Sequence, residues 1–138
     1  ELAQMLITSK RFDSATVISA TILLLSSIAH ADAPLEGTKP AHWRVLWTSN
    51  PATSATISWS TAKPGSSHKL HYWVKGNDAT KGVKLADSGR FTGGAVELHF
   101  HHVRLTELKP STAYEVQMQS DDDKSPVFYF VTGPENDR

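Results

Sequence analysis

The 138-residue chain contains no cysteine, which excludes both a disulfide framework and a thiolate-ligated metal site. It also has no excess charge of one sign, because 14 Lys and Arg residues are balanced by 14 Asp and Glu residues. Binding to nucleic-acid phosphates needs a basic stripe, so this balance argues against nucleic acid as a main partner. After residue 31 the sequence has no long helical period either, which argues against an α-helical domain.

The N-terminus has the three regions of a secretory signal peptide. A Lys-Arg pair stands at 10–11, a mostly apolar run covers 17–25, and Ala-His-Ala at 29–31 offers a small-x-small cleavage site. The apolar run is too short and too interrupted by Ser and Thr for a stable membrane span. We therefore expect a signal peptide over 1–31, with Met5 as its start, and a secreted or periplasmic product. The alternative is an ordinary amphipathic or disordered N-terminus.

Short segments of alternating polar and apolar residues, typical of half-buried strands, recur after this region. In the clearest one Ala55, Ile57 and Trp59 alternate with Ser and Thr, so Trp59 is expected in a hydrophobic core. Turn residues such as Pro and Gly separate the segments. The expected strands are 42–48 (Trp43, Val45 and Trp47 on one face), 54–60, 68–74 (Leu70, Tyr72 and Val74 inward), 83–88 as a short edge, 96–101, 114–119 and 127–132, with 89–94 loose. About seven such strands predict an all-β sandwich.

A corner precedes the sixth expected strand. Leu108, Pro110, Thr112 and Tyr114 form a Leu-x-Pro-x-Thr-x-Tyr segment, in which Pro110 cannot donate to a strand ladder and fixes its own φ. A Tyr at such a position can bury its ring and return its hydroxyl to nearby backbone, as in the tyrosine corner of Greek-key sandwiches. We expect Leu108, Pro110 and Tyr114 to be structural.

The region from Val96 to Thr132 resembles the last three strands of a fibronectin type III or immunoglobulin-like domain. More narrowly, the segment from His101-His102-Val103 to Tyr114 resembles the N-terminal domain of purple acid phosphatases. The closing segment, with Phe128, Phe130, Thr132 and Pro134 at alternate positions, fits the same pattern. The resemblance covers 40–134 and implies a fibronectin type III-like domain over 41–134.

The resemblance also implies what this chain lacks. Purple acid phosphatases carry a dinuclear metal site (iron with zinc, manganese or iron) in a separate α/β domain that follows the sandwich. Its ligands lie in Gly-Asp, Gly-Asn-His and Gly-His-x-His motifs. This chain has no Gly-Asp pair, the Gly-Asn-Asp at 76–78 lacks the His, and no Gly precedes His99-Phe100-His101. No catalytic or cofactor-binding residue is carried over; 32–40 is expected to be a linker, and 135–138 the start of a linker to the catalytic domain.

Seven histidines nevertheless suggest a metal site. His99 and His101 lie two residues apart on an expected strand, so they share a face, while His102 faces the other way. Imidazole suits zinc, iron or copper, but a site needs further ligands. We interpret His99 and His101 as solvated residues of the outer face, with metal binding as the alternative. Asp residues at 121–123 are likewise interpreted as a hydrated hairpin tip, with calcium as the alternative.

Together these features predict a non-catalytic N-terminal β-sandwich of a secreted purple acid phosphatase-like metallophosphoesterase. The expected partner is the catalytic domain of the same polypeptide, in which phosphomonoesters would be hydrolysed. Two alternatives stay open: a free-standing fibronectin type III binding or adhesion module, for example of a carbohydrate-active enzyme, and a small histidine-based metal carrier. The DNA downstream of Arg138 discriminates between them, because only the phosphatase reading requires metal-ligand motifs there.

Overall fold

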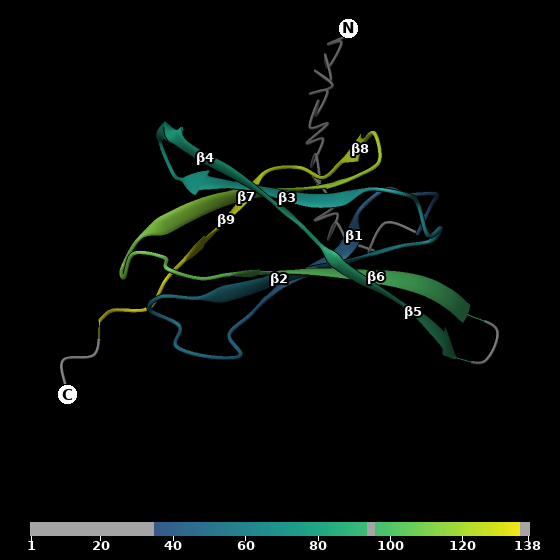
Figure 1. Ribbon diagram of the computed structural model, residues 1–138, viewed down its shortest axis with the longest axis horizontal. Helices are drawn as coiled ribbons and strands as arrows, with labels where there is room; N and C mark the ends of the chain where they lie inside the picture. Colours follow the sequence, from purple (N-terminus) through teal and green to yellow (C-terminus); the bar gives the residue numbers. More distant parts are fainter. Residues whose placement is uncertain (1–34, 94–95, 136–138) are drawn as a thin grey trace, which may run out of the picture.

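The computed structural model describes residues 35–93 and 96–135, which form two antiparallel sheets packed face to face (Figure 1). The strands are β1 (Ala41–Leu46), β2 (Ala55–Thr61), β3 (His68–Val74), β4 (Asn77–Leu85), β5 (Asp87–Gly93), β6 (Val96–Leu105), β7 (Ala113–Ser120), β8 (Asp123–Lys124) and β9 (Phe128–Val131). One sheet has the order β1-β2-β6-β5; the other has the order β4-β3-β7-β8, with β9 also paired to β7. The described residues contain no helix, so the predicted all-β sandwich is confirmed.

The hydrophobic core lies between the sheets and is built from alternate residues of the central strands. Ile57 and Trp59 on β2 and Val116 and Met118 on β7 have no exposed surface. Because successive side chains of a strand point to opposite faces, the polar residues between them lie outside. The core cluster is completed by Ala55, Leu70, Val103, Leu105, Leu108, Tyr114 and Phe130, with Val45, Tyr72, Val74, Ala86 and Phe128 packed against it.

The chain crosses from one sheet to the other between β4 and β5. β4 pairs with β3, the Ala86 N–H still donates to the His68 carbonyl at 2.9 Å, and β5 then pairs with β6 in the other sheet. In Figure 1 the two strands run as one diagonal line across that side of the sandwich. A single extended segment thus closes the side on which β3 and β6 approach each other.

The prediction for this segment was wrong in extent. A short edge strand over 83–88 followed by a loose 89–94 was expected, but β4 has nine residues and β5 has seven, each paired along most of its length. The glycines that suggested looseness lie under aromatic rings: a Cβ on Gly89 would lie 2.3 Å from a Phe100 ring carbon, and one on Gly93 would lie 2.7 Å from the Phe91 ring. Glycine here makes room for neighbouring rings. With β5 and the two-residue β8, the described residues contain nine strands, where about seven were predicted.

β1 is an edge strand whose tryptophans are only half covered. Val45 packs against the core, whereas Trp43 and Trp47 each keep 48% of their surface exposed. The register slips by one residue between Ala41 and Arg44, where His42 has a φ of 50°. Within this bulge the Trp43 ring stacks on Phe128 of β9, with ring centroids 4.0 Å apart. The two edge strands β1 and β9 therefore meet through an aromatic pair.

The described part of the expected linker, 35–40, is attached to the sandwich. The Lys63 N–H donates to the Gly37 carbonyl at 2.8 Å, and the Thr38 hydroxyl donates to Asp123 at 2.7 Å. These bonds hold the described part of the predicted linker on the sandwich. The predicted signal peptide (1–31) and residues 136–138 lie outside the described residues. Over 35–93 and 96–135, no helix is long and apolar enough to cross a membrane.

Candidate functional site

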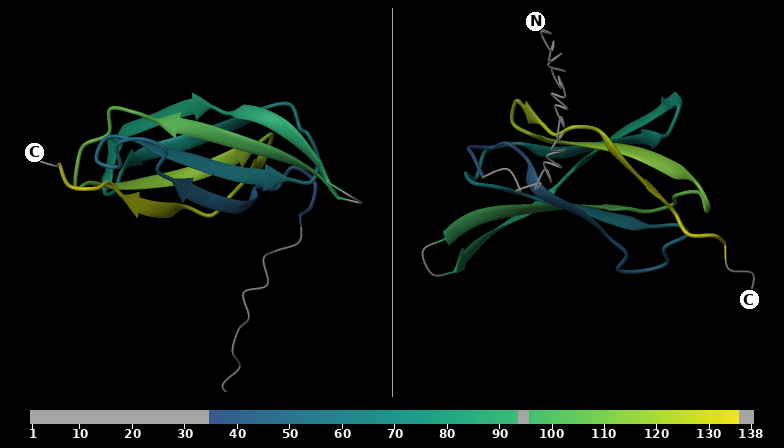
Figure 2. Two further views of the ribbon diagram at one scale, coloured as in Figure 1. Left: turned by 90° about the horizontal axis from the view of Figure 1, so that it is seen from below. Right: turned by 180° about the vertical axis from the view of Figure 1, so that it is seen from behind.

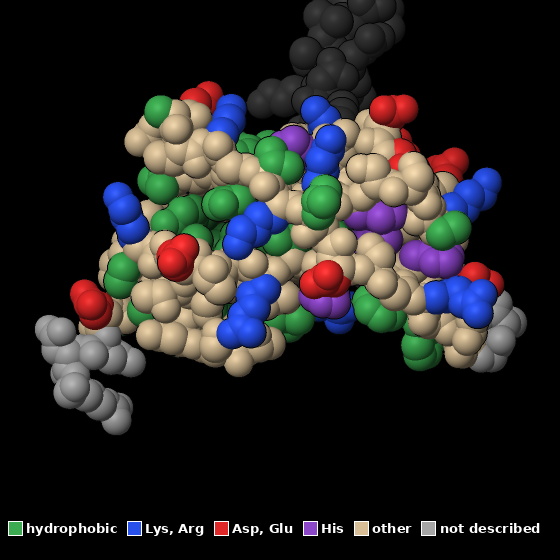
Figure 3. Space-filling view, in the orientation of Figure 1, with side chains coloured by type: hydrophobic (Ala, Val, Ile, Leu, Met, Phe, Trp, Pro, Cys, Tyr) green, Lys and Arg blue, Asp and Glu red, His purple; other side chains and the backbone are tan. Residues whose placement is uncertain are grey.

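Two histidines from opposite sheets meet at the side of the sandwich that β4 and β5 cross. His68 begins β3, and His101 lies in the middle of β6. Their rings stack with centroids 3.7 Å apart and an interplanar angle of 20°. Only 1% of the His101 surface is exposed. Figure 3 shows histidine side chains gathered on this side of the molecule. This stacked pair joins two titratable rings, one of them almost fully buried, so it is the first candidate for chemistry.

Both ring nitrogens of His101 form hydrogen bonds with hydroxyl groups. Nδ1 lies 2.8 Å from the Ser88 hydroxyl of β5, and Nε2 lies 3.0 Å from the Thr61 hydroxyl of β2. The Thr61 hydroxyl donates its own hydrogen to the Lys63 carbonyl at 2.7 Å, so it must accept a hydrogen from Nε2–H of His101. Nδ1 is then the acceptor and Ser88 the donor. The surroundings thus fit the neutral ring with its hydrogen on Nε2.

His68 is held in the same tautomer. Its Nε2 lies 2.7 Å from the Pro64 carbonyl, which can only accept, so Nε2 carries the hydrogen. Nδ1 accepts from the Ser120 hydroxyl at 2.9 Å, and Ser120 in turn accepts the indole N–H of Trp59 at 3.0 Å. A continuous chain of hydrogen bonds therefore runs from the centre of the core to the turn at Pro64 and ties β2, β3 and β7 together.

Burial is the main reason that the pKa of His101 is lowered, from 6.5 to about 4, and the charges of His68, His99 and His102 lower it further. A ring with this pKa is neutral at physiological pH and is a weak base. Although the Ser88 hydroxyl donates to His101, so weak a base would not activate it as a nucleophile near neutral pH. The pair is therefore suited to structure rather than to acid–base catalysis.

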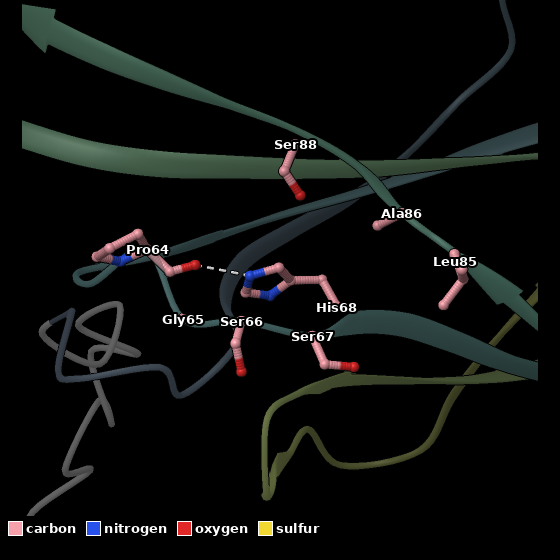
Figure 4. A pocket seen from close by; sticks show the side chains of 8 residues that line it. All are labelled: Pro64, Gly65, Ser66, Ser67, His68, Leu85, Ala86 and Ser88. Atoms are coloured by element: carbon pink, nitrogen blue, oxygen red, sulfur yellow. Dashed lines mark hydrogen bonds between the residues drawn. The ribbon is translucent and has the colours of Figure 1, made fainter.

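A shallow recess of about 490 Å³ lies in front of the pair. His68 and Ser88 face each other across it (Figure 4). The full lining is Pro64, Gly65, Ser66, Ser67, His68, Leu85, Ala86 and Ser88. It contains no carboxylate, and its one histidine already bonds at both ring nitrogens. The recess thus offers serine hydroxyls and main-chain groups but no acid–base pair.

The prediction that His99 and His101 lie on the solvated outer face was wrong. They do share a face, but it is the inner one: their exposed fractions are 8% and 1%. They continue the alternation of Val103 and Leu105, which are core residues, while Phe100 and His102 lie on the outer face with their rings stacked. The sequence did contain a signal for this: His99 and His101 lie an even number of residues from Val103 and Leu105, so all four share one face of the strand. Histidine was assigned outside because it is polar, yet hydroxyl partners make its burial favourable.

The metal alternative finds no ligand set among the described residues. Within 35–93 and 96–135 no group of three or more His, Asp or Glu side chains is arranged to hold a metal ion. Both nitrogens of His101 are already bonded to hydroxyls, and Nε2 of His99 lies 3.6 Å from Glu97, a single carboxylate. The described residues therefore do not fit a dinuclear metal centre.

The acidic hairpin tip has a structural role that the sequence did not reveal. One oxygen of Asp121 accepts the N–H groups of Ser66 and Ser67, both at 2.9 Å, and the Ser66 hydroxyl at 2.8 Å. The Ser66 N–H, followed by the Ser66 hydroxyl and the Ser67 N–H, lowers the pKa of Asp121. Asp121 thus fixes the turn that carries Pro64, the acceptor of His68. Ser66 lies in a turn, and Thr61, Ser88 and Ser120 lie in strands. Hydroxyl residues are common in both settings, so no pattern marked these four.

The residues expected to be structural lie in or against the core. Trp59 is fully buried and Tyr114 is 6% exposed. The Tyr114 hydroxyl accepts the Lys109 N–H at 2.9 Å, which is the geometry of a tyrosine corner. Leu108 is 5% exposed, and the Pro110 carbonyl accepts the Thr112 hydroxyl at 2.8 Å. On β9, Phe130 stacks on Tyr114 with centroids 5.8 Å apart, and Phe128 stacks on Trp43.

Comparison with solved structures supports the sandwich. A computer-redesigned β-sandwich protein is 19% identical with a TM-score of 0.50, covering 71% of this chain and 97% of that chain. Astrotactin-2, a vertebrate-specific, perforin-like membrane protein involved in neuronal development, is 16% identical with a TM-score of 0.54, covering 73% of this chain and 23% of that one. At these identities the likeness concerns the fold alone. No curated protein sequence matches the chain.

A family model identifies the sequence more closely. Residues 40–132 match the model of the purple acid phosphatase N-terminal domain. The matched span begins one residue before β1 and ends one residue after β9, so it contains both sheets and the histidine pair. The family is named for the N-terminal domain of purple acid phosphatases. This chain belongs to the family of purple acid phosphatase N-terminal domains.

Proposed function

We propose that the chain is the non-catalytic N-terminal domain of a secreted purple acid phosphatase-like metallophosphoesterase and acts as a scaffold packed on its catalytic domain. The observation that carries this proposal is the family match over 40–132. The parent protein would hydrolyse phosphomonoesters at low pH. Its two metal ions, iron with zinc, manganese or iron, belong to the catalytic domain and not to the described residues.

The described residues support the non-catalytic part of the proposal. The hydroxyls and ring nitrogens around His101 form hydrogen bonds with one another and with the Lys63 carbonyl. No buried side-chain nitrogen or oxygen in the described part of the chain lacks a hydrogen-bond partner. Catalytic groups that await a substrate usually leave some bonding capacity free. This network instead stiffens one side of the sandwich, which suits a domain that holds its shape against a neighbour.

Phosphatase assays test the proposal. Purified chain should show no turnover of p-nitrophenyl phosphate with added iron, zinc or manganese, whereas the polypeptide encoded by the complete gene should hydrolyse it in a metal-dependent way. Metal-dependent turnover by the chain itself, lost on changing His99 and His101 to Ala, would replace the scaffold by a small metalloenzyme. A gene without a downstream metallophosphoesterase would favour the free-standing binding module. Secretion is tested separately, by intact-mass detection of a chain starting at Asp32.

A further inference from the structure

The exposed apolar side chains of the described residues are concentrated on two neighbouring edge strands. Ten large hydrophobic side chains are exposed, and six of them belong to β1, β9 or the residues directly flanking these strands. We call this surface the β1–β9 margin. Its exposed members are Trp43, Leu46, Trp47, Val127, Tyr129 and Val131. Scattered apolar residues are ordinary on a protein surface, but a contiguous group of this kind marks an interaction site.

The margin is continuous across the two sheets. The stack of Trp43 on Phe128 joins β1 to β9, and the left view of Figure 2 shows the two strands side by side. Phe128 and Phe130 point toward the core, so Tyr129 and Val131 lie on the outer face by alternation. The apolar surface therefore wraps around one edge of the sandwich and is not confined to a single sheet.

The strands of the margin carry fewer charges of their own than the other edges, although Lys75 Nζ lies 4.0 Å from the centre of the Tyr129 ring. An exposed strand edge can pair or aggregate with other chains, and proteins usually blunt such edges with charges. β4 carries Asp78, Lys81 and Lys84, and β5 carries Asp87 and Arg90. In contrast, β9 has the sequence FYFV with no charge, and β1 has Arg44 as its one permanent charge. Each of β1 and β9 pairs with a single neighbour. An unprotected apolar edge is the expected state of a surface that is normally covered.

The chain also leaves the sandwich at this margin. After β9 the Thr132 N–H donates to the Thr112 carbonyl at 3.0 Å, and the Gly133 N–H donates to the Pro51 carbonyl at 2.9 Å. Pro51 belongs to the turn between β1 and β2, a few residues after Trp47. The backbone after β9 is thus held on the sandwich as far as the turn between β1 and β2. A domain joined after residue 133 begins beside β1 and β9, at a high effective concentration.

We infer that the β1–β9 margin is the surface on which the catalytic domain of the same polypeptide docks, an inference that rests on the proposed function. The occupant is this tethered domain because the exit of the chain, the apolar side chains and the unprotected edges coincide. Trp43 and Trp47 are the expected anchors, since tryptophan dominates binding energy in many interfaces when it is fully desolvated. Tyr129 and Val131 extend the contact onto the outer face of β9.

Hydroxyl-radical footprinting read by mass spectrometry tests the inference. The 138-residue chain is compared with the polypeptide encoded by the complete gene, and oxidation of Trp43, Trp47 and Tyr129 is measured. Phe91 is the internal control, because it is 54% exposed on β5, at the opposite edge. We expect the margin residues to be protected severalfold in the complete polypeptide and Phe91 to be unchanged. Equal oxidation in the two proteins, or protection of Phe91 alone, would overturn the inference.

A pair of charged variants separates contact from indirect stabilisation. Trp47→Asp combined with Val131→Asp should restore oxidation of Trp43 in the complete polypeptide. Leu85→Asp, at a β4 residue that is 78% exposed, is the matched control and should leave Trp43 protected. Trp43 that stays protected in the double variant would contradict the inference. An unchanged far-UV circular dichroism spectrum and a cooperative urea unfolding transition of the variant 138-residue chains show that the sandwich is intact.

Two further measurements distinguish the other occupants. Sedimentation of the 138-residue chain at increasing concentration should show a monomer; a dimer abolished by the double variant would assign the margin to a second copy and overturn the inference. A complete polypeptide that hydrolyses p-nitrophenyl phosphate but leaves the margin oxidised refutes only the docking surface. If that polypeptide has no phosphatase activity, the proposed function fails, whatever the footprint shows.

Discussion

Acidification should destabilise the domain through His101 before most carboxylates are protonated. The pKa of this ring is lowered from 6.5 to about 4 in the folded protein, mainly by burial. Between these two values the unfolded chain binds a proton at His101 and the folded chain does not. The free energy of unfolding therefore falls as the pH falls through this window, and the full contribution is present above about pH 6.5.

The size of the effect follows from the difference between the pKa of His101 in the unfolded and in the folded chain. Each pKa unit corresponds to about 1.4 kcal/mol, so His101 accounts for a loss of about 3 kcal/mol when the pH falls from 7 to 4. For a domain with a total stability of about 5–15 kcal/mol this is a large fraction. The carboxylate of Asp121 acts in a lower window, because its pKa is depressed from 3.8. Its stabilisation is present above that value and is lost at more acidic pH, so the two contributions are separable.

Urea unfolding followed by tryptophan fluorescence at several pH values between 7 and 4 measures this dependence. His101→Gln should be less stable at neutral pH, because one hydroxyl partner is lost, but it should lack the steep fall between pH 6.5 and 4. His102→Gln is the matched control: the His102 side chain is 43% exposed and is the smallest of the named contributors to the lowered pKa of His101, so most of the fall should remain. An unchanged slope in His101→Gln, or a slope removed by His102→Gln, would refute the reasoning.

Three other substitutions test the packing by denaturant unfolding. Trp59→Ala should cost about 3–5 kcal/mol by opening a cavity in the core, and an unchanged midpoint would contradict the assigned face of β2. Tyr114→Phe removes the bond from the Lys109 N–H and should cost about 1 kcal/mol; a neutral effect would mean that water replaces the hydroxyl. Gly65→Ala places a Cβ 2.8 Å from Asp121 at a φ of +60° and should cost about 1–3 kcal/mol. Gly37→Ala, at +53° with open space, should cost clearly less, and equal costs would contradict the clash.

The parts of the fold that the sequence predicted are those in which alternation and core packing agree. In β2 the expected inward residues Ala55, Ile57 and Trp59 all lie in the core cluster, although neighbouring polar residues of this central strand are buried as well. In β7 Tyr114, Val116 and Met118 alternate with half-buried polar residues. Both strands are flanked on each side by other strands. Their faces are therefore decided by hydrophobicity alone, which a single sequence displays.

The failures occurred where a distant partner decides the local structure. β5 looked loose because Gly89 and Gly93 have no side chains, but rings from Phe100 and Phe91 occupy that space. His101 looked solvated because its partners Thr61 and Ser88 lie 40 and 13 residues away. The same holds for Asp121, whose partners lie 54 and 55 residues earlier. Hydrogen bonds between residues so far apart in the sequence produce no periodic pattern, so the histidine network could not be predicted from the sequence.

The crossing at Ala86 has a consequence for how the domain opens. Because β4 and β5 form one extended segment shared by both sheets, neither sheet can detach on that side without pulling on the other. Separate opening of the sheets would break the ladder of β5 with β6 and strain that of β4 with β3 at once. Amide hydrogen exchange of β3 and β6 should therefore report a single cooperative opening event with nearly equal free energies. Slow exchange in one strand and fast exchange in the other would mean that the shared segment does not couple them.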